Sequence, residues 1–210
     1  RISNDVEILH LMNHTALNLH YVNGVPLTDQ MPPIEEFLKG NSKYKYDPVT
    51  TVNSQPGKKF NYSGGGFLVL EHLLEAITGK SAQELMKDYL ITLEINDLDF
   101  NQMNRNSAHA KGAEERKMFP AFAAGASGTA YAVGSFLKIL EHAYHDIQGC
   151  KNLSHEVAST MLHAFDLGSM EFMGASMGAG VFVAEAEDNS FAIHQGANDG
   201  FRAIFLHCFK

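Results

Sequence analysis

Cysteine and basic residues are scarce in this sequence. The two cysteines, Cys150 and Cys208, are too few to indicate a disulfide framework, and the sequence leaves their pairing open. There are 16 basic against 24 acidic residues, for a formal net charge of -8, and no basic run is longer than the Lys58-Lys59 pair. Nucleic-acid binding needs a basic surface, so the composition argues against a nucleic-acid partner.

Long apolar runs are also missing. No stretch approaches the roughly 20 apolar residues that a membrane-spanning helix requires, so we expect no membrane span in this chain. The first residues, 1–5, are mostly polar and resemble the lead-in to a helix, not a signal segment. Cysteine usage and the polar start together leave the cellular compartment open.

The remaining composition is that of an ordinary globular protein. Hydrophobic residues make up 45% of the 210 residues and charged residues 19%, and a chain of this length can bury a substantial core. We therefore expect one domain over 1–210, with a helical part at about 1–165 and an antiparallel sheet at about 178–210. The predicted fold class is α+β, an antiparallel sheet flanked by helices with a helical lobe.

Apolar residues at helical spacing, together with capping residues, predict the helices. Ser81 with Glu84 three residues later, and Asn4 with Glu7, match the pattern of a capping box. Residues 91–120 show no clear period and are predicted to be a long crossing loop. The expected helices lie at about 4–12, 34–38, 67–78, 81–90, 130–144 and 154–165.

After residue 178 the apolar pattern changes to that of strands. Residues 180–184 and 191–194, separated by Glu187, Asp188 and Asn189, predict a β-hairpin, and 202–209 a further strand. The prediction is three antiparallel strands at about 180–184, 190–195 and 202–208, in one domain with the helix at 67–78.

One stretch, 56–67, stands out for its possible chemistry. A Pro-Gly turn leads to Tyr62 and Ser63, and the three glycines 64–66 follow before an apolar helix. Glycines allow a backbone or a ligand to approach closely. This arrangement would place Tyr62 at a helix start, where free N–H groups could assist its hydroxyl. The plain alternative is a glycine loop with a packed tyrosine.

Other candidate motifs have simpler explanations. His142, His145 and Asp146 lie within about one helical turn, but a third ligand at recognisable spacing is not evident, so an exposed polar helix end is preferred to a metal site. No cofactor is expected.

Three serine motifs are rejected as nucleophile sites. Residues 174–178 match the text of a G-x-S-x-G elbow around Ser176, but they lack the preceding strand and following helix. Ser42 with Lys45 lies in a polar loop, which spoils the geometry of a serine-lysine pair. Ser135 with Lys138 lies mid-helix, where the hydroxyl would bond its own helix or water.

His194 is a second candidate for the site. It ends a predicted strand and is followed by Gly196, a turn and Gly200. A histidine here could supply a proton donor, and the strand could offer an open edge to a substrate backbone. An ordinary strand end followed by a glycine turn is the alternative.

Taken in order, these pieces resemble the serine β-lactamase and DD-peptidase superfamily, in its class C-like branch. The resemblance rests on five blocks spread over nearly the whole chain. The blocks are Leu11-Met12-Asn13-His14-Thr15, Pro56-Gly57 through Tyr62-Ser63, Thr78-Gly79-Lys80-Ser81, Ala123-Ala124-Gly125 through Thr129-Ala130, and His194-x-Gly196-x-Asn198-x-Gly200-Phe201.

The resemblance implies a role for each matching residue. Tyr62 would be the general base or proton relay for a nucleophilic serine, and His194 would lie opposite it across the cleft. The backbone N–H of Ala197, after Gly196, would be an oxyanion donor. The predicted substrate-binding and oxyanion group is Gly64, Gly196 and Ala197. Gly64 stands where the family has the asparagine of a Tyr-x-Asn motif, so the side-chain amide that would hold a substrate acylamino group is missing.

The resemblance also implies that the Ser-x-x-Lys segment precedes Arg1, and that closing elements follow Lys210. This chain alone would therefore be inactive.

The leading hypothesis is a serine hydrolase of amide or ester bonds that forms an acyl-enzyme, with a small-molecule or peptide substrate. The rival is a non-catalytic relative that binds a ligand or peptide in the same cleft. A periplasmic or secreted location follows only from the resemblance. The oligomeric state stays open.

Overall fold

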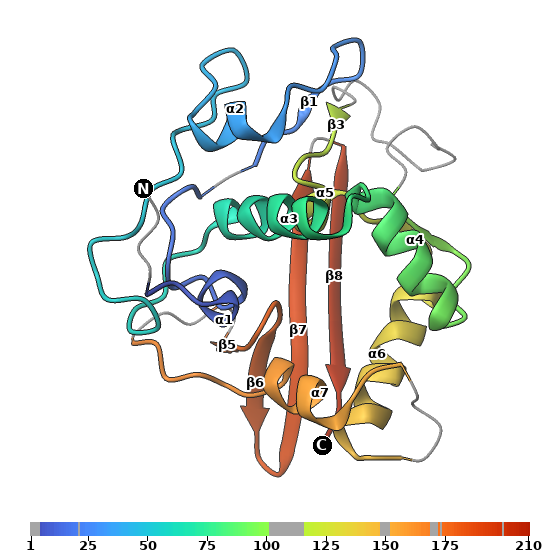
Figure 1. The fold of residues 1–210 in the computed structure, drawn as a ribbon. Coiled ribbons are helices and arrows are strands. Elements are labelled where there is room, and N and C mark those ends of the chain that lie inside the picture. The colour runs from blue at the N-terminus through green and yellow to red at the C-terminus, as the bar shows by residue number, and fades with distance from the viewer. Residues whose placement is uncertain are drawn as a thin grey trace.

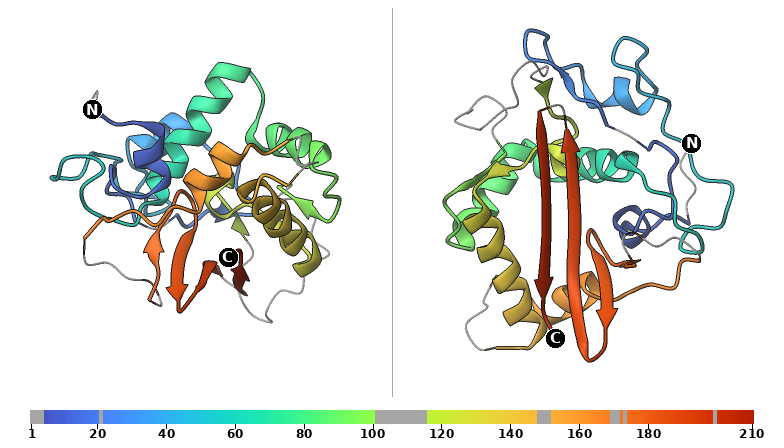
Figure 2. Two further views of the ribbon diagram at one scale, coloured as in Figure 1. Left: turned by 90° about the horizontal axis from the view of Figure 1, so that it is seen from below. Right: turned by 180° about the vertical axis from the view of Figure 1, so that it is seen from behind.

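The computed structural model describes residues 5–20, 22–100, 116–147, 152–168, 172, 174–198 and 200–210. Asn4 and Cys150, about which the sequence raised predictions, lie outside these residues. The chain forms a sheet with its helices gathered on one side of it, as Figures 1 and 2 show. The predicted α+β class, an antiparallel sheet flanked by helices, is confirmed.

The main sheet comprises four antiparallel strands in the order β5-β6-β7-β8. They are β5 (Ser176–Met177), β6 (Phe182–Ala186), β7 (Asn189–Asn198) and β8 (Phe201–Cys208). Ile193 of β7 pairs with Phe182 on one side and with Leu206 on the other. The predicted antiparallel pairing of the last three strands is confirmed, although β7 runs on to Asn198 and shortens the predicted turn.

The two faces of the sheet have different surroundings. Side chains alternate along β8: Phe205 packs against the cluster formed with α6 and α7, and His207 lies 3.0 Å from Glu141 of α6. Ile204 and Leu206, whose side chains alternate with these on the other face, are each 62% exposed. The right-hand view in Figure 2 looks onto this second face, which no helix of the described chain covers.

The helices agree with most of the predicted ranges. They are α1 (Ile8–Met12), α2 (Ile34–Leu38), α3 (Gly64–Thr78), α4 (Ala82–Thr92), α5 (Ala121–Ala124), α6 (Ala130–Tyr144) and α7 (His155–Met161). Several boundaries differ from prediction, among them the start of α3 at Gly64 instead of about 67. Helix α1 is capped by Glu7, whose partner is His10, and α7 ends at Met161 instead of near 165.

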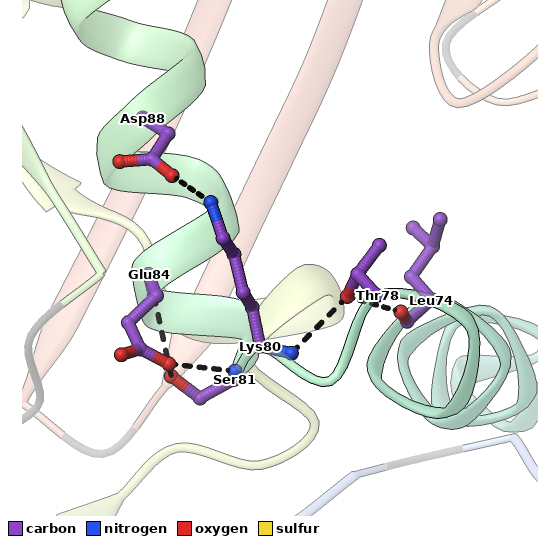
Figure 3. Close-up of polar contacts among 6 residues, drawn as sticks. All are labelled: Leu74, Thr78, Lys80, Ser81, Glu84 and Asp88. Atoms are coloured by element: carbon purple, nitrogen blue, oxygen red, sulfur yellow. Dashed lines mark hydrogen bonds and ion pairs between the residues drawn. The ribbon is translucent and has the colours of Figure 1, made fainter.

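The predicted capping box at α4 is present, as Figure 3 shows. The Ser81 hydroxyl accepts a hydrogen bond from the Glu84 N–H at 3.3 Å, and the Glu84 carboxylate accepts one from the Ser81 N–H at 2.9 Å. An exposed ion pair of 2.6 Å between Lys80 and Asp88 lies beside it. This box begins α4 shortly after α3 ends at Thr78, where the C-cap residue Gly79 adopts a left-handed conformation.

Short strands occur where the sequence predicted only loops. Strand β1 (Val25–Pro26) pairs with β3 (Arg116–Lys117), and β2 (Leu98–Asp99) pairs with β4 (Ser127–Gly128). A two-residue strand carries no detectable period, so only tertiary pairing defines it. Within the described residues no helix has both the length and the apolar character to cross a bilayer.

Candidate active site

The three glycines 64–66 form the first turn of α3, although the sequence pattern predicted that they would form a loop ahead of that helix. Helix α3 begins at Gly64, where the sequence pattern predicted a start near Phe67. A Cβ on Gly64 would lie 2.5 Å from Val22 Cγ1, and one on Gly66 would lie 2.6 Å from the Leu11 carbonyl oxygen. The glycines therefore let the segment from Leu11 to Val22 pack directly on the first turn of α3.

This packing surrounds Tyr62 with histidines. Tyr62 is half-buried just before α3, and the centre of its ring lies 4.3 Å from that of His14. The His20 ring meets its edge at 5.5 Å, and Phe60 lies 6.5 Å away. Tyr62 lies at a helix start, as the sequence pattern predicted, whereas the contacts of His14 and His20 with Tyr62 were not predicted.

His14 is a buried and neutral imidazole. It is 3% exposed, and its Nδ1 lies 3.1 Å from both the N–H and the carbonyl oxygen of Ser63. Burial lowers the pKa of His14 to about 4, opposed by the Ser63 backbone contact and assisted by the nearby His194 and His20. His14 is therefore uncharged near neutral pH.

His194 lies in β7 within a group of aromatic rings. Its ring centre is 5.6 Å from that of Phe182 and 6.3 Å from that of Phe205. Burial lowers the pKa of His194, so the neutral form dominates near pH 7. Its Nδ1 lies 2.8 Å from the Gln195 carbonyl oxygen, which can only accept, so Nδ1 carries the proton. Nε2 is then an acceptor in the neutral ring, and the role of His194 as a proton donor to a substrate stays a prediction.

Tyr62 and His194 belong to one chain of aromatic contacts. Phe60 lies 6.5 Å from Tyr62 and 6.0 Å from Phe182, and Phe182 contacts His194. His194, when protonated, also lowers the pKa of His14, which packs on Tyr62. The structure thus brings both predicted residues to the same region; direct facing of their side chains across a cleft stays a prediction.

The predicted substrate-binding group divides into two parts. The N–H of Gly64 donates to the His20 carbonyl oxygen at 3.1 Å, so in this structure it is not open to a substrate oxyanion. Gly196 and Ala197 are exposed in β7. Strand β6 pairs with β7 only as far as Ile193, so residues 194–198 are paired with β8 alone among the described strands. Among the described strands, one edge of β7 beside His194 therefore has no partner.

The three rejected serine motifs lie in different settings, and their lack of a nucleophile role stays a prediction. The Ser135 hydroxyl donates to the Tyr131 carbonyl oxygen at 2.9 Å, as expected for a mid-helix serine. Ser42 is exposed in a turn, and Ser176 lies in the two-residue strand β5, with no helix after it among the described residues. Ser63 is buried, and its hydroxyl donates to the Leu19 carbonyl oxygen at 2.8 Å.

Metal ligands do not gather in the part of the chain that is described. No group of three or more histidine, cysteine or acidic side chains there could hold a metal ion. His145 of the rejected cluster has Nε2 2.6 Å from the Phe209 carbonyl oxygen, so it joins the end of α6 to the end of the sheet.

Solved structures share this fold. The D-amino acid amidase from Ochrobactrum anthropi SV3, complexed with L-phenylalanine amide, is 14% identical with a TM-score of 0.66, over 94% of this chain and 60% of that chain. A penicillin binding protein from Bacillus halodurans is 15% identical with a TM-score of 0.64, over 99% and 69% respectively. At these identities the likeness concerns the fold, and this chain spans about 60% of the amidase.

The fold is that of the serine β-lactamase and DD-peptidase superfamily, as the resemblance predicted. A family model described as Beta-lactamase matches residues 3–208, and the chain therefore belongs to the Beta-lactamase family. Among curated proteins, none matches this sequence.

Proposed function

We propose that the protein is a serine hydrolase that cleaves amide or ester bonds through an acyl-enzyme, with its nucleophilic serine in sequence that precedes Arg1. The supporting observation is the position of Tyr62: it is held at the start of α3, against His14, in the same aromatic group as His194. Membership of the Beta-lactamase family supports the serine-hydrolase class.

Each residue of the site has a role in this proposal. Tyr62 acts as its phenolate, which the positive charge of the lysine in the Ser-x-x-Lys segment would stabilise. The phenolate oxygen accepts the proton of the serine hydroxyl while the serine oxygen attacks the substrate carbonyl carbon, and the carbonyl oxygen becomes the oxyanion of a tetrahedral intermediate. The Ala197 N–H donates to the oxyanion, an interaction of a few kcal/mol in acyl transfer. Tyr62 then passes the proton to the leaving group, and water later releases the acyl group from the serine by the reverse sequence. Neutral His194 accepts a hydrogen bond from the substrate or from water.

The open edge of β7 supports a substrate with an extended backbone. Residues 194–198 lie beyond the end of β6, where an amide-containing substrate could add to the sheet. A fold-level neighbour is a D-amino acid amidase, and another is a penicillin binding protein. We therefore place amides of D-amino acids first among candidate substrates, and penicillins and simple esters after them.

A non-catalytic relative that binds a peptide or small ligand is the alternative. It is favoured by Gly64, which replaces the asparagine of the resembled motif and whose N–H is already bonded to His20. Under this alternative the β7 edge and Tyr62 would bind a ligand without any covalent step.

Covalent labelling separates the two functions. A form of the protein that includes sequence preceding Arg1 should gain one adduct from a fluorophosphonate or a penicillin, measured by intact-protein mass. Tyr62→Phe should lower the labelling rate by about 100-fold or more, as expected when a general base is lost. Tyr131→Phe is the matched control, because Tyr131 is 81% exposed on α6. Equal rates for Tyr62→Phe and the parent protein would contradict the role of Tyr62; no adduct at all would favour the ligand-binding alternative.

The chain 1–210 itself should remain unlabelled under the same conditions. The Ser63 and Ser135 hydroxyls are bonded to backbone carbonyls, and Ser42 and Ser176 lie in an exposed turn and a strand. A stoichiometric adduct on any of these serines would show that the nucleophile lies within this chain.

A further inference from the structure

The peptide group between Tyr62 and Ser63 has an imidazole at each of its polar ends. The Tyr62 carbonyl oxygen lies 2.9 Å from Nδ1 of His20. The Ser63 N–H lies 3.1 Å from Nδ1 of His14. Both histidines come from the segment between α1 and α2, which packs on the start of α3. Two side chains of that segment therefore hold the same peptide plane.

The hydrogen bonds determine the form of each ring. A carbonyl oxygen can only accept, so His20 must donate from Nδ1–H. His14 Nδ1 lies 3.1 Å from both the N–H and the oxygen of Ser63, and the Ser63 oxygen has a donor of its own in the Gly66 N–H at 3.3 Å, so the Ser63 N–H decides the form of the His14 ring. The buried Ser63 N–H has no other acceptor among the described residues, so His14 accepts through Nδ1 and carries its proton on Nε2.

The His14 ring also packs against the side chain that the peptide group carries. Its centre lies 4.3 Å from the Tyr62 ring, 5.6 Å from Phe67 and 5.9 Å from Phe60. Because His14 is almost fully buried, it has little freedom to move away. His14 therefore restrains both the backbone and the ring of Tyr62, and His20 restrains the backbone as well.

We propose that His14 and His20 are positioning residues that together fix the Tyr62 backbone and ring in a single orientation, one accepting and one donating a hydrogen bond. The proposal deepens the proposed function, since Tyr62 is the proton acceptor there. It is tested without a substrate, so its failure can be told apart from failure of the hydrolase assignment. Neither histidine contacts the reacting atoms in this proposal.

Amide hydrogen exchange at Ser63 measures the His14 bond. His14→Leu removes the acceptor, and exchange of the Ser63 amide should become at least about 10-fold faster, as expected for loss of one hydrogen bond. His14→Asn places a side-chain oxygen near the position of Nδ1 and should restore most of the protection. The Tyr62 ring resonances, followed with labelled tyrosine, should move toward those of an exposed tyrosine in His14→Leu and less in His14→Asn.

A second pair of variants, at the exposed His20, tests the same proposal. His20→Leu should shift the carbonyl carbon resonance of Tyr62, and His20→Asn, which can donate from its amide, should restore it. His142→Leu on α6 is the control for removal of a histidine elsewhere. Unchanged Ser63 exchange in a folded His14→Leu chain, or equal effects of Leu and Asn at both positions, would overturn the proposal. If His14→Leu does not fold, the His20 pair decides the result alone.

Discussion

Gly66 lies where the first turn of α3 approaches the end of α1. A Cβ there would be 2.6 Å from the Leu11 carbonyl oxygen, a distance that real contacts do not reach. From the sequence, three glycines indicated a loop, because glycine has a low helix propensity. The structure shows that close packing of two backbones required them, and that this tertiary contact outweighs the propensity.

This contact gives a prediction at the scale of single residues. Gly66→Ala should lower the free energy of unfolding by about 2 kcal/mol or more, because the backbone of Leu11 cannot move aside cheaply. Gly134→Ala is the control: Gly134 is exposed within α6, and an added Cβ meets nothing within 4 Å. That change should raise the free energy of unfolding by about 0.5–1 kcal/mol. Urea unfolding measures both, and equal effects would contradict the packing explanation.

Tyr62 and His194 were accessible from the sequence through the motifs that carry the family resemblance. His14 was present in one of the quoted blocks, yet its role depends on contacts with Ser63 and Tyr62, which lie far along the chain. Nothing in the local pattern distinguishes it from an ordinary core histidine. The engaged N–H of Gly64 was equally hidden, since its partner is the backbone of His20.

At the scale of elements, α3, α4 and α6 could be predicted because apolar spacing and capping residues agree in each. Ser81, Thr129 and Ser154 all accept a hydrogen bond from a first-turn N–H of the helix that follows. The predicted boundaries failed where caps were ambiguous, as at Glu7. The pairs β1–β3 and β2–β4 could not be predicted, because each joins two-residue segments that lie far apart in sequence.

The cap of α4 provides a test at this scale. Ser81→Ala should lower the free energy of unfolding by about 1 kcal/mol, because the Glu84 N–H loses its acceptor and the reciprocal bond loses its geometry. Ser42→Ala, in an exposed turn, is the control and should have little effect. A chemical-denaturation midpoint for Ser81→Ala that coincides with that of Ser42→Ala would show that the capping box adds nothing.

At the scale of the whole molecule, the candidate site arises from three regions: the α1–α2 segment, the start of α3 and β7. Figure 1 shows that the fold brings them together although they lie far apart along the chain. The sequence could name Tyr62 and His194 and predict the sheet that carries His194. It could not show that Phe60 and Phe182 connect them, because that connection depends on how the sheet meets the helices.

Two buried ionisable side chains, His14 and Glu71, are expected to change the stability of the fold with pH in opposite directions. Burial lowers the pKa of His14 from 6.5 to about 4, so its contribution to stability is present above pH 6.5 and is lost as pH falls toward 4. Burial, with a smaller effect of Glu75, raises the pKa of Glu71 from 4.5 to about 7, although the Phe122 N–H opposes it. Its contribution is present below pH 4.5 and is lost as pH rises through about 7. Each of these pKa shifts corresponds to a change of about 3 kcal/mol at most in the free energy of unfolding.

Between pH 4.5 and 6.5 the two effects should largely cancel in the parent chain. Glu71→Gln removes the carboxylate but keeps an oxygen that can accept from the Phe122 N–H, which lies 3.0 Å from Glu71. Urea unfolding should then show the variant gaining up to about 3 kcal/mol over the parent between pH 4.5 and 7.5. The variant's own stability should rise from pH 4 to 6.5, as the uncompensated His14 effect requires. Glu36→Gln, an exposed change on α2, controls for net charge. A constant difference between variant and parent across this range would mean that Glu71 is not buried as the structure has it.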